Sequence, residues 1–346
     1  MKEELVMKKK LALVLSTVLA ASFALAGCGG GEEPVVDENV EVAAGDLKTG
    51  IAIGATVAKS TDAAADAEGL AQTDAVIAAV VVDAEGKIVS CELDMAQTKI
   101  GFSADGKITT DPSSPFLTKQ ELGEDYGLKK ASKIGKEWYE QADAFAAYCI
   151  GKTAAEVLGI SAEEGDLKAS VSVSINDYQA TVAKAVENAV VTGAQEGDKL
   201  GLGVVTDITK STDAAADADG LAQAYTTVTA VTVGADGKIT SSVIDAVQAN
   251  VNFDAAGKIT SDLSAAISTK NELGDSYGLK KASSIGKEWY EQAAAYAAYA
   301  VGKTVDEVNA TELTEGVPAD ADLAASVTVH VTDFNTVITK AVANAE

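Results

Sequence analysis

The chain has 346 residues, of which 47% are hydrophobic, and its formal net charge at pH 7 is −25. Such an acidic surface repels nucleic acid and anionic lipid head groups, so it argues against nucleic-acid binding and favours solubility or cationic partners. One histidine and three cysteines leave no ligand cluster in the sequence for a zinc, iron–sulfur or c-type haem site.

The amino-terminal segment has the pattern of an export signal. Met7 to Cys28 reads MKKKLALVLSTVLAASFALAGC, and its apolar run is shorter than the roughly 20 residues of a membrane-spanning helix. Leu25-Ala26-Gly27-Cys28 is similar to the lipobox of bacterial lipoproteins, in which the cysteine becomes the lipid-bearing amino terminus. We therefore predict a signal peptide at 1–27, lipidation of Cys28, a flexible acidic tether at 28–44, and anchoring at the extracellular face of the membrane. An ordinary secreted protein with an incidental cysteine is the alternative.

The remainder of the chain repeats one module. Ser60–Gln72 (STDAAADAEGLAQ) and Ser211–Gln223 (STDAAADADGLAQ) differ at one position, and Gly127–Ala142 returns with one difference as Gly278–Ala293. Both pairs are offset by 151 residues. We place the modules at 45–193 and 194–346, and expect a residue that the chemistry requires to occur in both.

Each module begins with strands. Val76–Asp83 is an apolar, β-branched run, and a turn separates it from Ile88–Asp94, which predicts a hairpin. The second hairpin is expected at Ala230–Val233 and Ile239–Asp245. A third short strand is expected near Gly101–Phe102.

Helices follow the strands. We expect them over Thr118–Lys130 and Gly135–Gly151, because apolar residues recur in the latter at helical spacing and Gly151 suits a helix end. Thr153 and Thr304 are predicted to cap a short helix, and Asp177 and Asp333 to cap the last one. The predicted fold class is α+β, with two tandem copies of an antiparallel sheet and packed helices.

The histidine and the cysteines do not recur. His330 corresponds to Ser174, and Cys91 and Cys149 correspond to Ser242 and Ala300. We expect Cys91 and Cys149 to be small buried hydrophobic residues, with a disulfide between them as the alternative.

The close of each module is rich in hydroxyl groups. Asp166–Ile175 reads DLKASVSVSI, Asp322–Val331 reads DLAASVTVHV, and a helix rich in Ala, Val and Lys follows each. Alternation with period two is also typical of a half-exposed strand. The segment resembles the end of FMN-binding domains of the RnfG and NqrC type, which close with D-x-x-S-G-A-T before a similar helix.

In that family the threonine receives FMN as a phosphoester from a flavin transferase. The resemblance implies Thr328 as the acceptor in the second module and Ser172 in the first. Because Ala-Ser-Val stands where Ser-Gly-Ala is expected, Ser326 and Ser170 are the alternatives.

The whole chain resembles PplA-type lipoproteins of Gram-positive bacteria in its lipobox, acidic tether, paired modules and ELGxxYGLKKASxIGKEWYEQ segment. That resemblance implies an electron carrier, not an enzyme, with covalent FMN in each module. Electrons would come from a membrane NADH dehydrogenase or a quinone-linked donor and pass to extracellular acceptors such as free flavin or metal oxide. A ligand-binding or adhesion lipoprotein without a cofactor and a purely structural surface protein are the alternatives.

Further candidates for flavin contact recur in both modules, each with an ordinary structural role as the alternative. They are Trp138 and Trp289, which are otherwise core residues; Tyr126 and Tyr277, otherwise loop anchors; and Gln97, Gln248, Asp94 and Asp245, otherwise polar strand ends.

The remaining acidic residues indicate no enzymatic chemistry. Asp62, Asp66 and Asp74, with Asp213 and Asp217, resemble a weak calcium cluster, but a solvated acidic loop explains them as well, since EF-hand spacing is missing. The sequence contains no catalytic triad, Walker loop or dinucleotide fingerprint.

Overall fold

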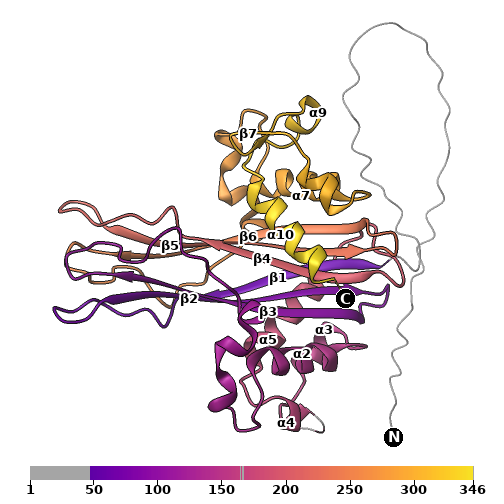
Figure 1. The fold of residues 1–346 in the computed structure, drawn as a ribbon, viewed down its shortest axis with the longest axis horizontal. Helices are drawn as coiled ribbons and strands as arrows, with labels where there is room; N and C mark the ends of the chain where they lie inside the picture. The colour runs from indigo at the N-terminus through magenta and orange to yellow at the C-terminus, as the bar shows by residue number, and fades with distance from the viewer. Residues whose placement is uncertain (1–46, 164, 166, 346) are drawn as a thin grey trace, which may run out of the picture. The chain divides into compact units, whose positions relative to one another are not determined.

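Each module folds as a three-stranded antiparallel sheet with helices on one of its faces (Figure 1). The structure, a computed structural model, describes residues 47–163, 165 and 167–345, so the predicted signal peptide, Cys28 and tether lie outside the described residues. The strands are β1 (Lys48–Thr56), β2 (Gly69–Val82) and β3 (Ile88–Phe102) in the first module, and β4 (Lys199–Asp207), β5 (Gly220–Val233) and β6 (Ile239–Phe253) in the second.

The helices also recur in the same order in both modules. The first module contains α1 (Lys119–Leu122), the 3-10 turns η1 (Gly123–Tyr126) and η2 (Leu128–Lys130), α2 (Trp138–Cys149), α3 (Ala154–Leu158), α4 (Leu167–Ser170) and α5 (Asn176–Glu187). The second contains α6 (Lys270–Leu273), η3 (Gly274–Tyr277), η4 (Leu279–Lys281), α7 (Trp289–Ala300), α8 (Val305–Asn309), the ribbon β7 (Leu313–Thr314) and β8 (Val317–Pro318), α9 (Ala321–Ala324) and α10 (Thr332–Ala343). None of the described helices has the length and apolarity needed to cross a bilayer.

The predicted α+β class and both hairpins are confirmed. The strand orders are β1-β2-β3 and β4-β5-β6, with antiparallel pairing throughout. The hairpin strands are longer than predicted, and the expected short strand at Gly101–Phe102 is the end of β3. The first strand of each sheet, β1 and β4, was not predicted, because its glycines lower the strand propensity of the sequence.

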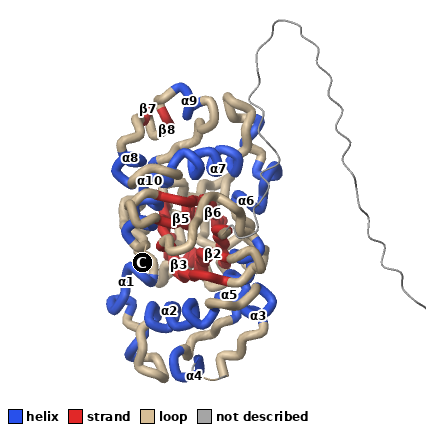
Figure 2. The backbone as a smooth tube through the Cα atoms, turned by 90° about the vertical axis from the view of Figure 1, so that its right-hand side faces the viewer, coloured by secondary structure: helices blue, strands red, loops and turns tan. Residues whose placement is uncertain are grey.

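The two sheets pack against each other, and the helices cover their outer faces (Figures 1 and 2). Alternate residues of β2 therefore have different neighbours. Val76, Ala78 and Val80 contact the helices of their own module, whereas Ile77 and Ala79 contact the opposite sheet. Because both faces are buried, the second half of β2, from Ala75 to Val82, is apolar without interruption, unlike a strand with one solvated face.

The acidic loops connect the modules reciprocally. Asp62 Oδ1 accepts from the amide of Ile259 and Asp213 Oδ1 accepts from the amide of Ile108, each at 2.8 Å. Between these contacts the rings of Phe102 and Phe253 stack, with centroids 4.3 Å apart. The near-identical STDAAADA segments thus contribute to an interface with approximate two-fold symmetry, while Asp62, Asp66, Asp213 and Asp217 stay exposed, as predicted for a solvated acidic loop.

Two of the helix predictions require correction. The expected helix over Thr118–Lys130 is divided into α1, η1 and η2, because Gly123 and Gly127 adopt positive φ values of 50° and 76°. The last helix is capped by Ile175 or Val331, with no side-chain hydrogen bond, so the predicted caps Asp177 and Asp333 are wrong and lie in the first turn.

Other local predictions are confirmed. Gly151 follows α2 with a φ of 78°, and Thr153 and Thr304 cap α3 and α8 with complete capping boxes. Cys91 and Cys149 are free and buried in the first-module core, and burial raises the pKa of the Cys149 thiol to about 12. The alternative disulfide is not formed.

Close packing of α5 on β1 makes Gly50 a sensitive position. A Cβ at Gly50 would lie 2.0 Å from Ala185 O, and its counterpart Gly201 has the same relation to Ala341 O at 1.9 Å. We expect Gly50→Ala to lower the free energy of unfolding by about 2–3 kcal/mol, measured by chemical denaturation. Gly159→Ala is the control, because Gly159 has a φ of −86° and its nearest neighbour would be 3.5 Å away. Equal stability of the two variants would contradict the packing argument.

Candidate functional site

The segment that carries the predicted attachment residue belongs to no sheet. Residues 171–175 follow α4 and lead into α5 without strand pairing, so the half-exposed strand is wrong for this segment. Val171 and Ile175 are buried, while Ser172 and Ser174 are exposed. The alternating pattern therefore reflects two apolar anchors that hold a hydroxyl-bearing segment at the surface.

A buried glutamine fixes this segment in each module. In the first module Gln141 Oε1 accepts from Ser172 N at 2.8 Å, Ser172 Oγ at 3.1 Å and Val173 N at 3.2 Å. In the second, Gln292 Oε1 accepts from Thr328 N at 2.8 Å, from its Oγ1 at 3.1 Å and from Val329 N at 3.1 Å. Both glutamines are fully buried, and the two hydroxyls therefore occupy equivalent positions.

The alternative acceptors lie two residues earlier in the chain. Ser170 is the last residue of α4, and Ser326 follows α9 with its amide donating to Leu323 O. Both are half-buried. The glutamine contacts described above involve Ser172 and Thr328, not these two residues.

A lysine-rich loop adjoins the Ser172 hydroxyl. Ser132 Oγ lies 3.4 Å from Ser172 Oγ, and Gln141 Nε2 donates to Ser132 Oγ and to Lys136 O. Gln292 makes the same contacts with Ser283 and Lys287. The loop carries four lysines in the first module and three in the second: Lys129, Lys130, Lys133 and Lys136, and Lys280, Lys281 and Lys287. In a chain of net charge −25, this concentration of positive charge is suited to a phosphate group.

The next helix supplies a second feature that suits a phosphate. α5 and α10 each have 12 residues and begin without a side-chain cap, four residues after Ser172 and Thr328 respectively. Uncapped first-turn amides and the helix dipole favour an anion.

The predicted tryptophans are core residues. Trp138 and Trp289 are 2% and 3% exposed, and each packs edge-on against an aromatic ring of the last helix, Tyr178 or Phe334. Trp138 Nε1 also donates to Tyr178 OH at 2.8 Å. The structural role is therefore the one observed, and a flavin ring has no open tryptophan face to stack on at these positions.

Tyr126 and Tyr277 each lie beside a buried lysine of their own module. Lys119 Nζ lies 4.5 Å from the ring centre of Tyr126 and 5.3 Å from that of Trp138. In the second module Lys270 Nζ lies 4.5 to 4.8 Å from the ring centres of Tyr225, Tyr277 and Trp289. These cation–π contacts make the two tyrosines anchors of the loop, the structural role predicted for them.

The surroundings of Lys119 and Lys270 differ at one position. Lys270 Nζ donates to Tyr225 OH at 2.7 Å, and burial lowers the pKa of Lys270 to about 7. The residue that corresponds to Tyr225 is Asp74, which is buried in β2 and pairs with Lys59 at 2.6 Å. Asp74 is therefore not part of the predicted acidic cluster with Asp62 and Asp66.

The strand residues that were predicted to contact the flavin edge form hydrogen bonds with neighbouring strands and helices. Asp94 and Asp245 are buried within β3 and β6, where each accepts from the next backbone amide and from the amide of Gln120 or Asn271. They attach α1 and α6 to the sheet. Gln97 donates to Asp74 and Gln248 to Gln223, so these four residues form contacts within the sheet layer.

The buried carboxyl of Asp94 predicts a pH dependence of stability. Burial raises its pKa from 3.8 to about 6, so the folded protein retains a proton that the unfolded chain has lost, and stability falls as pH rises through this range. Asp94→Asn keeps an oxygen acceptor without the charge. We expect the variant to gain about 2 kcal/mol relative to wild type between pH 4 and pH 7, measured by urea unfolding. Glu124→Gln, at an exposed position, is the control, and parallel profiles for Asp94→Asn and wild type would contradict the prediction.

Gln141, Gln292, Lys119 and Lys270 were missed by the sequence analysis. All four are buried polar residues that recur in both modules. Recurrence was therefore the available signal, but nothing in the sequence showed that these side chains face inward. Among the residues that the structure describes, no group of three or more His, Cys, Asp or Glu side chains is placed to hold a metal ion.

Comparison with known proteins gives one partial similarity. A curated protein named chlorophenol reductase, from Desulfitobacterium hafniense, is 33% identical to this chain over 129 residues. The match covers 34% of this chain and 38% of that protein. No family model matches the chain, and no solved structure matches it.

Proposed function

We propose that this chain is a cell-surface lipoprotein that carries a covalent FMN on Ser172 and another on Thr328. It would relay electrons from a membrane NADH dehydrogenase or quinone-linked donor to extracellular acceptors such as free flavin or metal oxide. The observation that carries the proposal is the equivalent placement of two hydroxyls by Gln141 and Gln292 beside a lysine-rich loop. The proposed electron transfer is supported by the similarity to a protein whose name, chlorophenol reductase, describes a redox activity.

The residues around each hydroxyl fit a flavin phosphate. Ser172 is exposed and Thr328 half-buried, so a transferase can reach the oxygen that would form the phosphoester. The lysine-rich loop and the uncapped start of α5 or α10 would neutralise the phosphate charge. A bound FMN supplies one- and two-electron transfer through its ring. Because Trp138 and Trp289 are buried, the ring would lie on the surface near the loop.

The chain's own residues would hold the phosphoester in place. The glutamine carbonyl fixes the backbone on both sides of the attachment oxygen, and its amide group fixes the loop at Lys136 O or Lys287 O. One side chain thus holds both the hydroxyl and the backbone of the lysine-rich loop. Two such sites would give each chain two electron-carrying groups, one on each module.

The test is the mass of the protein produced with and without a flavin transferase. Coexpression should add two FMN groups to the intact mass and give a fluorescent band on a denaturing gel, whereas the chain alone should remain unmodified. An established substrate of the same transferase, expressed in the same cells, controls for enzyme activity. If that substrate is flavinylated while every serine and threonine of this chain stays unmodified, the proposal fails.

A further inference from the structure

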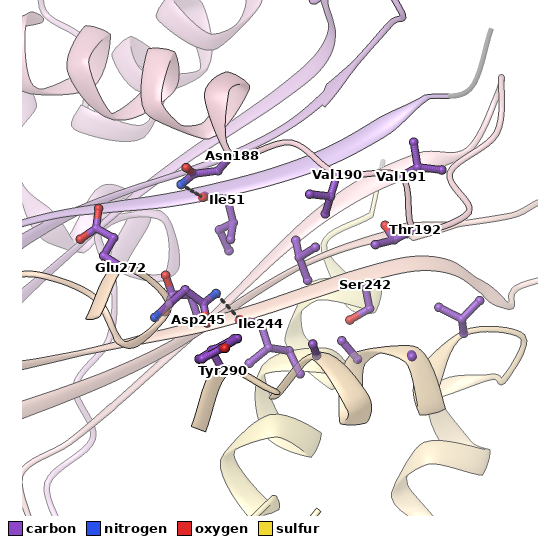
Figure 3. Close-up of a pocket in the computed structure, with 16 residues that line it drawn as sticks. Ile51, Asn188, Val190, Val191, Thr192, Ser242, Ile244, Asp245, Glu272 and Tyr290 are labelled. Carbon is purple, nitrogen blue, oxygen red and sulfur yellow. Dashed lines mark hydrogen bonds between the residues drawn. The ribbon is translucent and has the colours of Figure 1, made fainter. Parts of the chain in front are cut away.

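A cavity of about 670 Å³ lies where the segment after α5 meets β6 and α7 (Figure 3). Val190, Val191 and Thr192 form one side, and Ser242, Ile244 and Tyr290 belong to the other (Figure 3). We call it the Ser242 cavity. Its volume is within the range of sites for small organic ligands, about 300–1,000 Å³.

Two residues that line this cavity carry hydroxyl groups without hydrogen-bond partners among the described residues. Ser242 is 2% exposed and its Oγ has no partner, and Thr192 Oγ1 is in the same condition. Both residues line the Ser242 cavity. An unpaired buried hydroxyl costs about 1–3 kcal/mol, and rotation of the Ser242 side chain toward the cavity would let a ligand oxygen accept from its Oγ and remove this penalty.

The charged groups of the cavity are already engaged. Asp245 accepts from the amides of Ala246 and Asn271, and Glu272 pairs with Lys184 of the other module. Neither carboxylate is therefore free to pair with a cationic ligand, and their negative charge disfavours an anionic one. A neutral ligand suits this lining best.

The remaining wall is apolar and free of long side chains. Ala294, Ala297 and Ala298 present one face of α7, next to Ile244 of β6. Such a surface leaves room for a rigid ring and offers it close contact.

The symmetry-related cavity provides a comparison within the same molecule. It has a volume of about 530 Å³ and is lined by Cys91, Glu92 and Asp143, where the Ser242 cavity has Ser242, Val243 and Ala294. We call it the Cys91 cavity. Both modules therefore have a cavity at the equivalent position, but only the Ser242 cavity combines an apolar wall with unpaired hydroxyl groups.

We propose that the Ser242 cavity binds a neutral organic molecule of one or two rings that carries a carbonyl oxygen, which accepts a hydrogen bond from Ser242 Oγ. This site is separate from Ser172 and Thr328, and its occupation does not depend on flavin attachment.

The probe is 2,3-dimethyl-1,4-naphthoquinone, a neutral ring system with two carbonyl oxygens, titrated calorimetrically into the purified chain. Ala298→Phe fills the Ser242 cavity from an exposed position on α7, and Ala147→Phe does the same in the Cys91 cavity. We expect one bound probe per chain, at least tenfold weaker binding in Ala298→Phe, and unchanged binding in Ala147→Phe. Ser242→Ala should weaken binding about fivefold through loss of one hydrogen bond.

Charged analogues separate this proposal from general apolar binding. The anion 2-naphthoate and a naphthylmethylammonium cation should each bind at least tenfold more weakly than the quinone. No binding of the quinone, equal effects of Ala298→Phe and Ala147→Phe, or tighter binding of either ion would overturn the proposal. Because the titration uses unmodified protein, its failure leaves the flavin proposal standing, and failed flavinylation leaves this one standing.

Discussion

Replacement of Thr328 by alanine should remove one FMN from protein made with a flavin transferase, and replacement of Ser172 should remove the other. The double variant should carry none. The reason is chemical, since alanine offers no oxygen for the phosphoester while the surrounding backbone stays fixed by Gln292 or Gln141. Intact mass gives the number of FMN groups directly, and peptide mapping gives their positions.

The neighbouring hydroxyls provide the controls for this experiment. Ser170→Ala and Ser326→Ala should retain both FMN groups, and Thr328→Ser should remain a substrate because it keeps the oxygen. If Ser326→Ala loses a flavin that Thr328→Ala retains, the attachment residue is the alternative one. That outcome would move the site by two residues without removing the proposed function.

Replacement of Gln292 by leucine should destabilise the second module and reduce flavinylation of Thr328. Leucine has a similar size but no acceptor, so the amides of the half-buried Thr328 and Val329 would lose the partner that the fully buried Gln292 supplies. We expect a loss of about 2–4 kcal/mol in the free energy of unfolding, because each unsatisfied buried group costs about 1–3 kcal/mol. Urea denaturation measures this change, and Gln195→Leu at an exposed loop position is the control.

The same variant distinguishes a positioning role from a purely structural one. If Gln292 places the hydroxyl for transfer, the mass spectrum should show loss of FMN from Thr328 and full retention on Ser172. Gln141→Leu should give the reverse pattern. Equal loss from both modules would indicate general unfolding, and unchanged labelling of both would show that the glutamine does not position the acceptor.

The sequence shows the duplication because near-identical segments recur at one offset. The hairpin, the short capped helix and the last helix were therefore each predicted in both modules. The hairpins followed from β-branched runs with intervening turns, and the short helices from threonine caps. These features depend on neighbours in the chain. Residues in the first strand of each sheet gave no such signal, because glycine is favoured there by close helix packing.

The roles of the polar residues were decided by tertiary structure. Ser172 and Thr328 were found from sequence, but Gln141 and Gln292, about 30 residues away in the chain, hold them. Asp62 is exposed, as its local sequence predicts, but no local pattern shows that it also accepts from an amide of the opposite module. The sequence determines which segments are apolar, which turn and which repeat, because these are properties of short windows. Which buried polar groups meet depends on how the sheets stack, and no local pattern contains that information.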